Sequence, residues 1–104
     1  MQEFGLLLID MTSVAIIIVN WHGKQDTLSC LASLGKFKVK SLKLEVIVVD
    51  NGSTDDSVVA IKKNFPDVEV VEAGENLGFA GGNNIGIRRA LEWGADYIWL
   101  LNND

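Results

Sequence analysis

Cysteine, positive charge and long hydrophobic runs are all scarce in this sequence of 104 residues. Cys30 is the only cysteine, which excludes an intramolecular disulfide and favours a reducing compartment. The formal net charge of −5 argues against a basic patch and therefore against nucleic acid as a main partner. The first apolar run, at residues 6–9, is too short for a secretion signal or a membrane span. We therefore expect a cytoplasmic protein, either free or at the inner face of the membrane.

Apolar residues make up 48% of the sequence, which is enough for the buried core of one domain. We expect residues 1–12 to be an N-terminal extension and residues 13–104 to form that domain. Short runs rich in valine and isoleucine predict four β-strands, at residues 14–19, 44–49, 68–71 and 97–101. These runs are unbroken rather than alternating, which is typical of parallel strands buried on both faces.

The segments between the predicted strands have apolar residues at helical spacing. One apolar face ends before Gly35, a second before Pro66 and a third before Gly94. Strands that alternate with helices predict an α/β fold, in which helices cover both faces of a doubly wound, mostly parallel sheet in three layers. Trp93 and Trp99 are expected to pack within this fold.

Polar residues follow each predicted strand, at the edge where open parallel sheets bind ligands. The sharpest change from apolar to polar is "VIVVDNGSTDDS", residues 46–57. Asp50 and Asn51 in this stretch have two interpretations. They form a turn, since Asp and Asn bond to nearby backbone and tolerate positive φ, or they contact a ligand. Ser53 and Asp56 also match a capping box for the next helix.

The glycine-rich segment after the third strand favours the ligand interpretation. Gly78, Gly81 and Gly82 permit close backbone approach, and the N–H groups at the start of the following helix can face an anion such as a diphosphate. The dinucleotide fingerprint should instead follow the first strand, and the sequence contains no P-loop pattern.

The order of five motifs resembles the family 2 inverting glycosyltransferases of GT-A fold, in particular their rhamnosyltransferase-like branch. The motifs are "VAIIIVNWHG", "CLASL", "VIVVDNGSTDDS", "ENLGFAGGNNIGI" and "YIWLLNND". Together they cover nearly all of residues 13–104. The resemblance implies the Rossmann-like GT-A fold and the half of the enzyme that binds a nucleoside-diphosphate sugar linked to dTDP, UDP or GDP.

The resemblance also implies roles for individual residues. Val19 and Trp21 would line the pocket for the base, and Asp50 with Asn51 would face that base. The loop before the third helix would wrap the nucleotide through Phe79, Gly82 and Asn83. Asn102, Asn103 and Asp104 stand where the family has its D-x-D motif, which holds Mg²⁺ or Mn²⁺ against the diphosphate. Asp104 is the only one of these three with a carboxylate, so the metal would bind mainly there.

By resemblance, such an enzyme transfers the sugar, with inversion, to a hydroxyl of a glycan or lipid-linked acceptor in polysaccharide or cell-wall biosynthesis. The general base of that reaction would lie beyond Asp104. The alternative is an inactive module that binds a nucleotide or associates with itself, since apolar surface left uncovered promotes association. A sugar-phosphate nucleotidylyltransferase is disfavoured, because its glycine-rich loop would follow the first strand. His22 is expected at the surface without a catalytic role, and Arg88 or Arg89 in solvent.

Overall fold

One parallel sheet of four strands forms the centre of the computed structural model, which describes residues 12–37 and 39–103. The strands are β1 (Thr12–Asn20), β2 (Leu42–Asp50), β3 (Glu69–Glu72) and β4 (Tyr97–Leu100). They lie in the order β3-β2-β1-β4, and each pairs with its neighbours in parallel. The predicted α/β fold with a doubly wound parallel sheet is confirmed, because each apolar run overlaps one of these strands.

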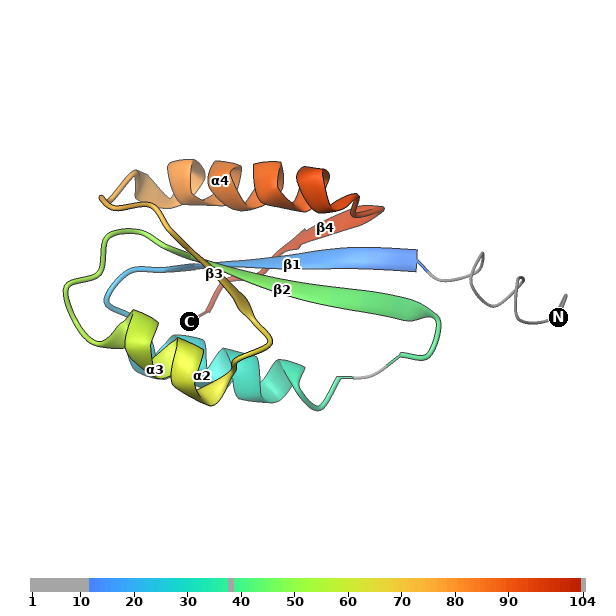
Figure 1. Ribbon diagram of the computed structural model, residues 1–104, viewed down its shortest axis with the longest axis horizontal. Helices are drawn as coiled ribbons and strands as arrows, with labels where there is room; N and C mark the ends of the chain where they lie inside the picture. The colour runs from blue at the N-terminus through green and yellow to red at the C-terminus, as the bar shows by residue number, and fades with distance from the viewer. Residues whose placement is uncertain (1–11, 38, 104) are drawn as a thin grey trace, which may run out of the picture.

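Helices cover both faces of the sheet (Figure 1). α2 (Lys24–Leu34) and α3 (Ser57–Asn64) pack on one face, and α4 (Gly78–Trp93) covers the other. Alternate residues of β1 point to opposite faces, so Ile17 joins Ala90 of α4 in one core and Ile18 joins Leu31 of α2 in the other. Both faces of the central strands are therefore buried, which is the reason that their apolar runs are unbroken.

α4 approaches the sheet closely because two of its glycines face β1. A Cβ atom at Gly86 would lie 2.4 Å from Cγ2 of Ile17, and one at Gly82 would lie 2.9 Å from Cγ1 of Val19. The two glycines are one helical turn apart, so they form a flat strip against the strand. This contact places the first turn of α4 beside the carboxyl end of β1.

The carboxyl ends of the strands lie together at one edge of the sheet, on the left in Figure 1. The chain moves outward from β1 to β2 and β3 and then returns to form β4 on the other side of β1. In open α/β sheets, ligands bind outside the carboxyl ends of the strands where the strand order reverses in this way. The helices also begin at this edge, so their free N–H groups point toward it.

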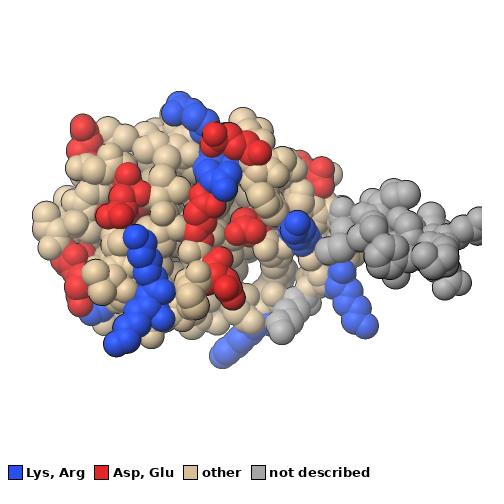
Figure 2. Space-filling view, viewed as in Figure 1, with Lys and Arg blue, Asp and Glu red and all other residues tan. Residues whose placement is uncertain are grey.

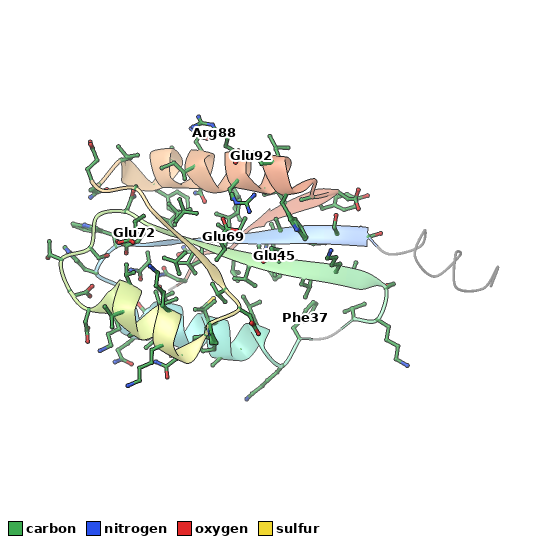
Figure 3. All side chains as sticks on the ribbon, viewed as in Figure 1. Phe37, Glu45, Glu69, Glu72, Arg88 and Glu92 are labelled. Atoms are coloured by element: carbon green, nitrogen blue, oxygen red, sulfur yellow. The ribbon has the colours of Figure 1, made fainter. Side chains whose placement is uncertain are left out.

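The sheet edges differ in charge. Glu69 and Glu72 of β3 form ion pairs with Arg89 and Lys62, and the pairing with Glu69 raises the pKa of Arg89. Figure 2 shows acidic and basic side chains interspersed over this side of the molecule, and Figure 3 shows Glu69 and Glu72 along it. Arg88 points outward from α4 in Figure 3, so neither arginine of α4 is placed to contact a ligand at the carboxyl edge.

The opposite edge strand, β4, is apolar and partly uncovered. Tyr97 is 66% exposed, Trp99 43% and Leu100 45%. The expectation that both tryptophans pack is therefore wrong for Trp99, because no helix of the described chain covers the outer part of an edge strand. Trp93 does pack against the core beneath α4, and Nζ of Lys43 lies 5.6 Å from the centre of its ring.

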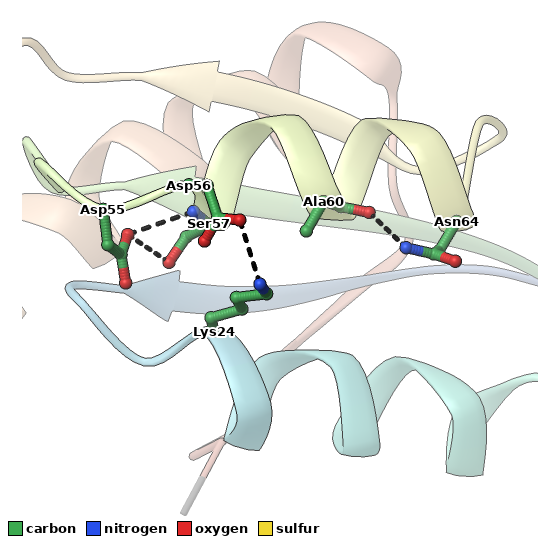
Figure 4. Close-up of polar contacts among 6 residues, drawn as sticks. All are labelled: Lys24, Asp55, Asp56, Ser57, Ala60 and Asn64. Atoms are coloured by element: carbon green, nitrogen blue, oxygen red, sulfur yellow. Dashed lines mark hydrogen bonds and ion pairs between the residues drawn. The ribbon is translucent and has the colours of Figure 1, made fainter.

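The predicted capping box at the start of α3 is not formed. The N-cap residue is Asp56, and its side chain makes no capping hydrogen bond. Asp55 instead accepts hydrogen bonds from the backbone N–H and the hydroxyl of Ser57, and Lys24 pairs with Asp56 (Figure 4). The bonds from Ser57 lower the pKa of Asp55. Ser53 instead donates its N–H and its hydroxyl to Asp50.

Candidate functional site

A cavity of about 480 Å³ opens at the carboxyl edge of the sheet. This volume is within the range of small-molecule sites in proteins, about 300–1,000 Å³. The cavity is bounded by the loops that follow the four strands and by the first turns of α2 and α4. Its lining residues are Val19, Trp21, His22, Gly23, Asp26, Asn51, Asn76, Gly78, Phe79 and Asn103.

The structure brings five of the predicted site residues together in this cavity, namely Val19, Trp21, Asn51, Phe79 and Asn103. Three others lie behind its wall. Asp50 and Asn83 are almost fully buried, and Gly82 packs under Val19 and Asn51. The predicted metal ligand, Asp104, lies outside the described residues.

Two aromatic side chains line the cavity and leave much of their surface open. Trp21 is 52% exposed and Phe79 is 62% exposed, although rings of this size usually bury most of their area. Trp21 contacts the ring of His22, with 4.7 Å between the ring centroids. The cavity therefore offers free aromatic surface to a ligand.

His22 is exposed, as the sequence suggested, and it also connects two loops. Its backbone is in the left-handed region, with φ of 53°, which is uncommon for a residue with a side chain. Ser53 accepts a hydrogen bond from its N–H at 2.9 Å, and its Nε2 accepts one from the N–H of Thr54 at 3.0 Å. These bonds hold the loop after β1 against the loop after β2 and set the place of Trp21. Because Nε2 is occupied, His22 is not placed as a general base.

The carboxylate of Asp50 is used inside the protein. Oδ2 accepts the N–H of Ser53 at 2.9 Å, and Oδ1 accepts the Ser53 hydroxyl at 2.7 Å and Nδ2 of Asn20 at 2.9 Å. Only 3% of the residue is exposed. Asp50 thus organises the turn and joins it to the end of β1, as the first of the two sequence interpretations describes.

Asn51 connects the turn after β2 to the start of α4. Its Oδ1 accepts the N–H of Leu77 at 3.2 Å, and its Nδ2 donates to the carbonyl oxygen of Gly78 at 2.8 Å. The residue lines the cavity but is only 2% exposed. Its amide therefore fixes the position of the glycine-rich loop.

Thr27, which no sequence motif singled out, connects Asn20 to Asn103 beneath the site. Thr27 of α2 donates its hydroxyl to Oδ1 of Asn20 at 2.6 Å, and Nδ2 of Asn103 donates to the Thr27 oxygen at 2.8 Å. Both Asn20 and Thr27 are fully buried. Thr27 precedes Leu31 by four residues on the buried stripe of α2, so a hydroxyl at an expected apolar position was the available signal.

The described part of the cavity wall has no lysine or arginine, and Asp26 is its one acidic residue. Positive potential comes instead from the first turn of α4, where Gly78 and Phe79 line the cavity. No group of three or more potential metal ligands of the His, Cys, Asp or Glu type occurs within residues 12–37 and 39–103. No helix of that same part of the chain is long and apolar enough to cross a membrane.

The sequence matches the profile of the family described as Glycosyl transferase family 2 over residues 13–104. It is 30% identical over 95 residues to the low-salt glycan biosynthesis hexosyltransferase Agl10 of Haloferax volcanii, covering 90% of this chain and 28% of that protein. It is 34% identical over 97 residues to the galactofuranosyltransferase GlfT1 of Mycobacterium tuberculosis, covering 90% of this chain and 31% of that protein.

The fold is similar to that of a solved structure, the mannosyltransferase PcManGT of Pyrobaculum calidifontis in complex with GDP-Man and Mn²⁺. The TM-score is 0.62 at 27% identity, over 74% of this chain and 24% of that chain. This chain thus spans less than a third of the length of the curated relatives described above. These relatives are named for hexose, galactofuranose and mannose transfer, so the rhamnosyltransferase-like branch stays a prediction.

Proposed function

Since this chain belongs to glycosyl transferase family 2, we propose that its cavity binds the nucleoside-diphosphate part of a sugar donor. The observation that carries this proposal is one cavity that combines exposed aromatic side chains with the N-terminus of a helix of 16 residues. The first feature suits a base, and the second suits a phosphate group. The donor would be linked to UDP, dTDP or GDP.

The base would lie against Trp21, with Phe79 and Val19 completing an apolar wall. A flat ring stacks on an aromatic side chain whatever its substituents, so Trp21 provides affinity without choosing among bases. Asn51 and Asn76 add polar side chains to the same cavity lining. Asp50 supports this wall from behind through Ser53 and Asn20.

The diphosphate would lie toward the first turn of α4 and the segment after β4. A divalent cation fits this part of the site because the described lining provides no cationic side chain to balance the diphosphate. Oδ1 of Asn103 and the carboxylate of Asp104 are hard oxygen ligands of the kind that Mg²⁺ and Mn²⁺ prefer. When bound, such an ion would stabilise the negative charge that develops on the leaving diphosphate.

The proposed reaction is transfer of the sugar to a hydroxyl of a glycan or lipid-linked acceptor, with inversion. His22 is engaged through Nε2, so it is not assigned as the base that deprotonates the acceptor. The chain is proposed to hold the donor, and a cytoplasmic location, free or at the inner face of the membrane, is part of this proposal.

Titration calorimetry with UDP, dTDP and GDP, with and without Mn²⁺, tests the proposal. We expect at least one diphosphate to bind, and Mn²⁺ and nucleotide to raise each other's affinity by the same factor. The corresponding nucleoside monophosphate is the control, since it offers the cation fewer oxygen atoms. Asp104→Asn should reduce the enhancement by Mn²⁺.

Three outcomes would change the proposal. If none of the diphosphates binds, donor binding by this chain is wrong. If Mn²⁺ enhances binding equally in the wild type and in Asp104→Asn, Asp104 is not a metal ligand. If the diphosphates bind but Mn²⁺ has no effect on either protein, this chain binds the nucleotide without a metal.

We also propose that two copies of the chain associate through β4. The outward edge of this strand has no charged residue, whereas the β3 edge carries two paired glutamates, and uncharged edge strands are the ones that pair with other chains. Sedimentation equilibrium should show a dimer or larger oligomer. Trp99→Lys should give a monomer, and Val59→Lys, at an exposed position of α3, should not. A wild type that stays monomeric over a wide concentration range would refute this prediction.

A further inference from the structure

We infer that Thr27 is a positioning residue. It belongs to a series of hydrogen bonds from Asp50 to Asn103 in which each donor and acceptor is fixed, and so it presents the amide oxygen of Asn103 to the ligand. The inference rests on the proposed function for its ligand, but the hydrogen-bonded chain itself lies within the described structure. The chain runs from Asp50 through Asn20 and Thr27 to Asn103, and its successive bonds measure 2.9, 2.6 and 2.8 Å.

The direction of every bond in this chain is set at its buried end. A carboxylate only accepts hydrogen bonds, so Asn20 must turn its Nδ2 toward Asp50. Its Oδ1 then faces Thr27 and must accept the hydroxyl proton of that residue. The Thr27 oxygen, having given its proton to Asn20, is free only to accept, and Nδ2 of Asn103 is the donor that it meets.

This sequence of donors and acceptors leaves Asn103 in one orientation. An asparagine amide can rotate by half a turn and exchange its oxygen with its nitrogen, and the two orientations differ only in their hydrogen bonds. The reverse orientation would place Oδ1 of Asn103 against the Thr27 oxygen, acceptor against acceptor. Oδ1 therefore stays away from Thr27, and it has no protein partner within the described residues. Since Asn103 lines the cavity, this oxygen is available to a metal ion or to a donor group of the ligand.

Burial makes the arrangement rigid. Asn20 and Thr27 are fully buried and Asp50 nearly so, so water does not compete for their bonds, and no buried side-chain nitrogen or oxygen of the described residues is left without a partner. Breaking one bond in such a chain leaves a neighbouring polar group unpaired, which costs more than the bond itself contributes. Thr27 is thus the point at which α2 connects the turn after β2 to the segment after β4.

The test compares Thr27→Val, which keeps the shape but removes the hydroxyl, with Thr27→Ser, which keeps the hydroxyl. Ser57→Ala is the matched control, because Ser57 is also a fully buried hydroxyl at the start of a helix on the same face of the sheet. The Ser57 hydroxyl bonds to Asp55 (Figure 4), so Ser57 lies outside the series of hydrogen bonds that ends at Asn103.

The first measurement is made on the protein without ligand. In NMR spectra, the side-chain NH₂ protons of Asn103 should show slowed solvent exchange in the wild type and in Thr27→Ser. In Thr27→Val this protection should be lost, and in Ser57→Ala it should remain. Equal exchange of the Asn103 amide in Thr27→Val and in the wild type would overturn the inference.

The second measurement is affinity for UDP, dTDP or GDP in the presence of Mn²⁺. Thr27→Val should weaken binding by about three- to tenfold, the effect of one hydrogen bond, whereas Thr27→Ser and Ser57→Ala should bind as the wild type does. In an Asn103→Ala background, Thr27→Val should cause no further loss, because both changes remove the same contact. Additive losses in the double variant would also overturn the inference.

The two measurements separate this inference from the proposed function. If the wild type binds no nucleoside diphosphate, the proposed function fails, and the exchange of the Asn103 amide alone decides whether Thr27 orients it. If the wild type binds but Thr27→Val binds equally well, the proposed function stands and the role of Thr27 is wrong.

Discussion

Asp50→Ala should lower the free energy of unfolding by about 2–4 kcal/mol, because it removes a buried charged acceptor from donors of Asn20 and Ser53. Those donors would remain in a region that water does not reach, since Asn20 is fully buried and Asp50 is 3% exposed. The loss would be a large part of the total stability of a domain of this size, which is typically about 5–15 kcal/mol. Urea denaturation followed by circular dichroism measures it.

Asp50→Asn keeps the side-chain volume and changes only the hydrogen-bond pattern, so it separates these two effects on stability. Whichever oxygen the amide replaces, an NH₂ group would then face a donor of Ser53 or of Asn20, so this variant should also be destabilised. Asp56→Ala is the control, because Asp56 forms an exposed ion pair with Lys24, and such pairs contribute little. Unchanged stability of Asp50→Ala together with lost nucleotide binding would instead support contact between Asp50 and the base.

Trp21→Ala should weaken nucleotide binding by about 1–3 kcal/mol, the usual contribution of one aromatic side chain that stacks on a base. Trp21 lines the cavity with half of its surface exposed, so the substitution removes contact area without opening the core. The melting temperature should therefore change little. Calorimetry with the diphosphate that the wild type binds best measures the effect.

Trp21→Phe should retain part of the affinity, because a smaller ring still offers an aromatic face. Trp99→Ala is the matched control: Trp99 has similar exposure but lies on β4, outside the cavity lining. If Trp21→Ala and Trp99→Ala bind the nucleotide equally well, the base does not lie on Trp21. A similar loss in both variants would indicate a general effect on the fold.

Several features of this protein follow from the sequence alone, because local patterns determine them. The unbroken apolar runs at β1 and β2 predict strands buried on both faces, and the structure confirms the parallel sheet with helices on both sides. The rule that parallel sheets bind ligands at their carboxyl edge places Trp21, Asn51, Phe79 and Asn103 on one side, and the cavity brings them together.

The tertiary structure alone decided how the polar side chains are used. Asp50 meets Asn20 from 30 residues away, and Asn103 meets Thr27 from 76 residues away, so no local pattern could identify either pair. The capping box is not formed because the Ser53 hydroxyl donates to Asp50, three residues before it, and accepts from His22, 31 residues away, rather than bonding to α3. Burial of apolar residues depends on the composition of a segment and on the spacing of its apolar residues, both of which are visible in the local sequence. A hydrogen bond depends on the relative placement of two atoms, which only the folded chain provides.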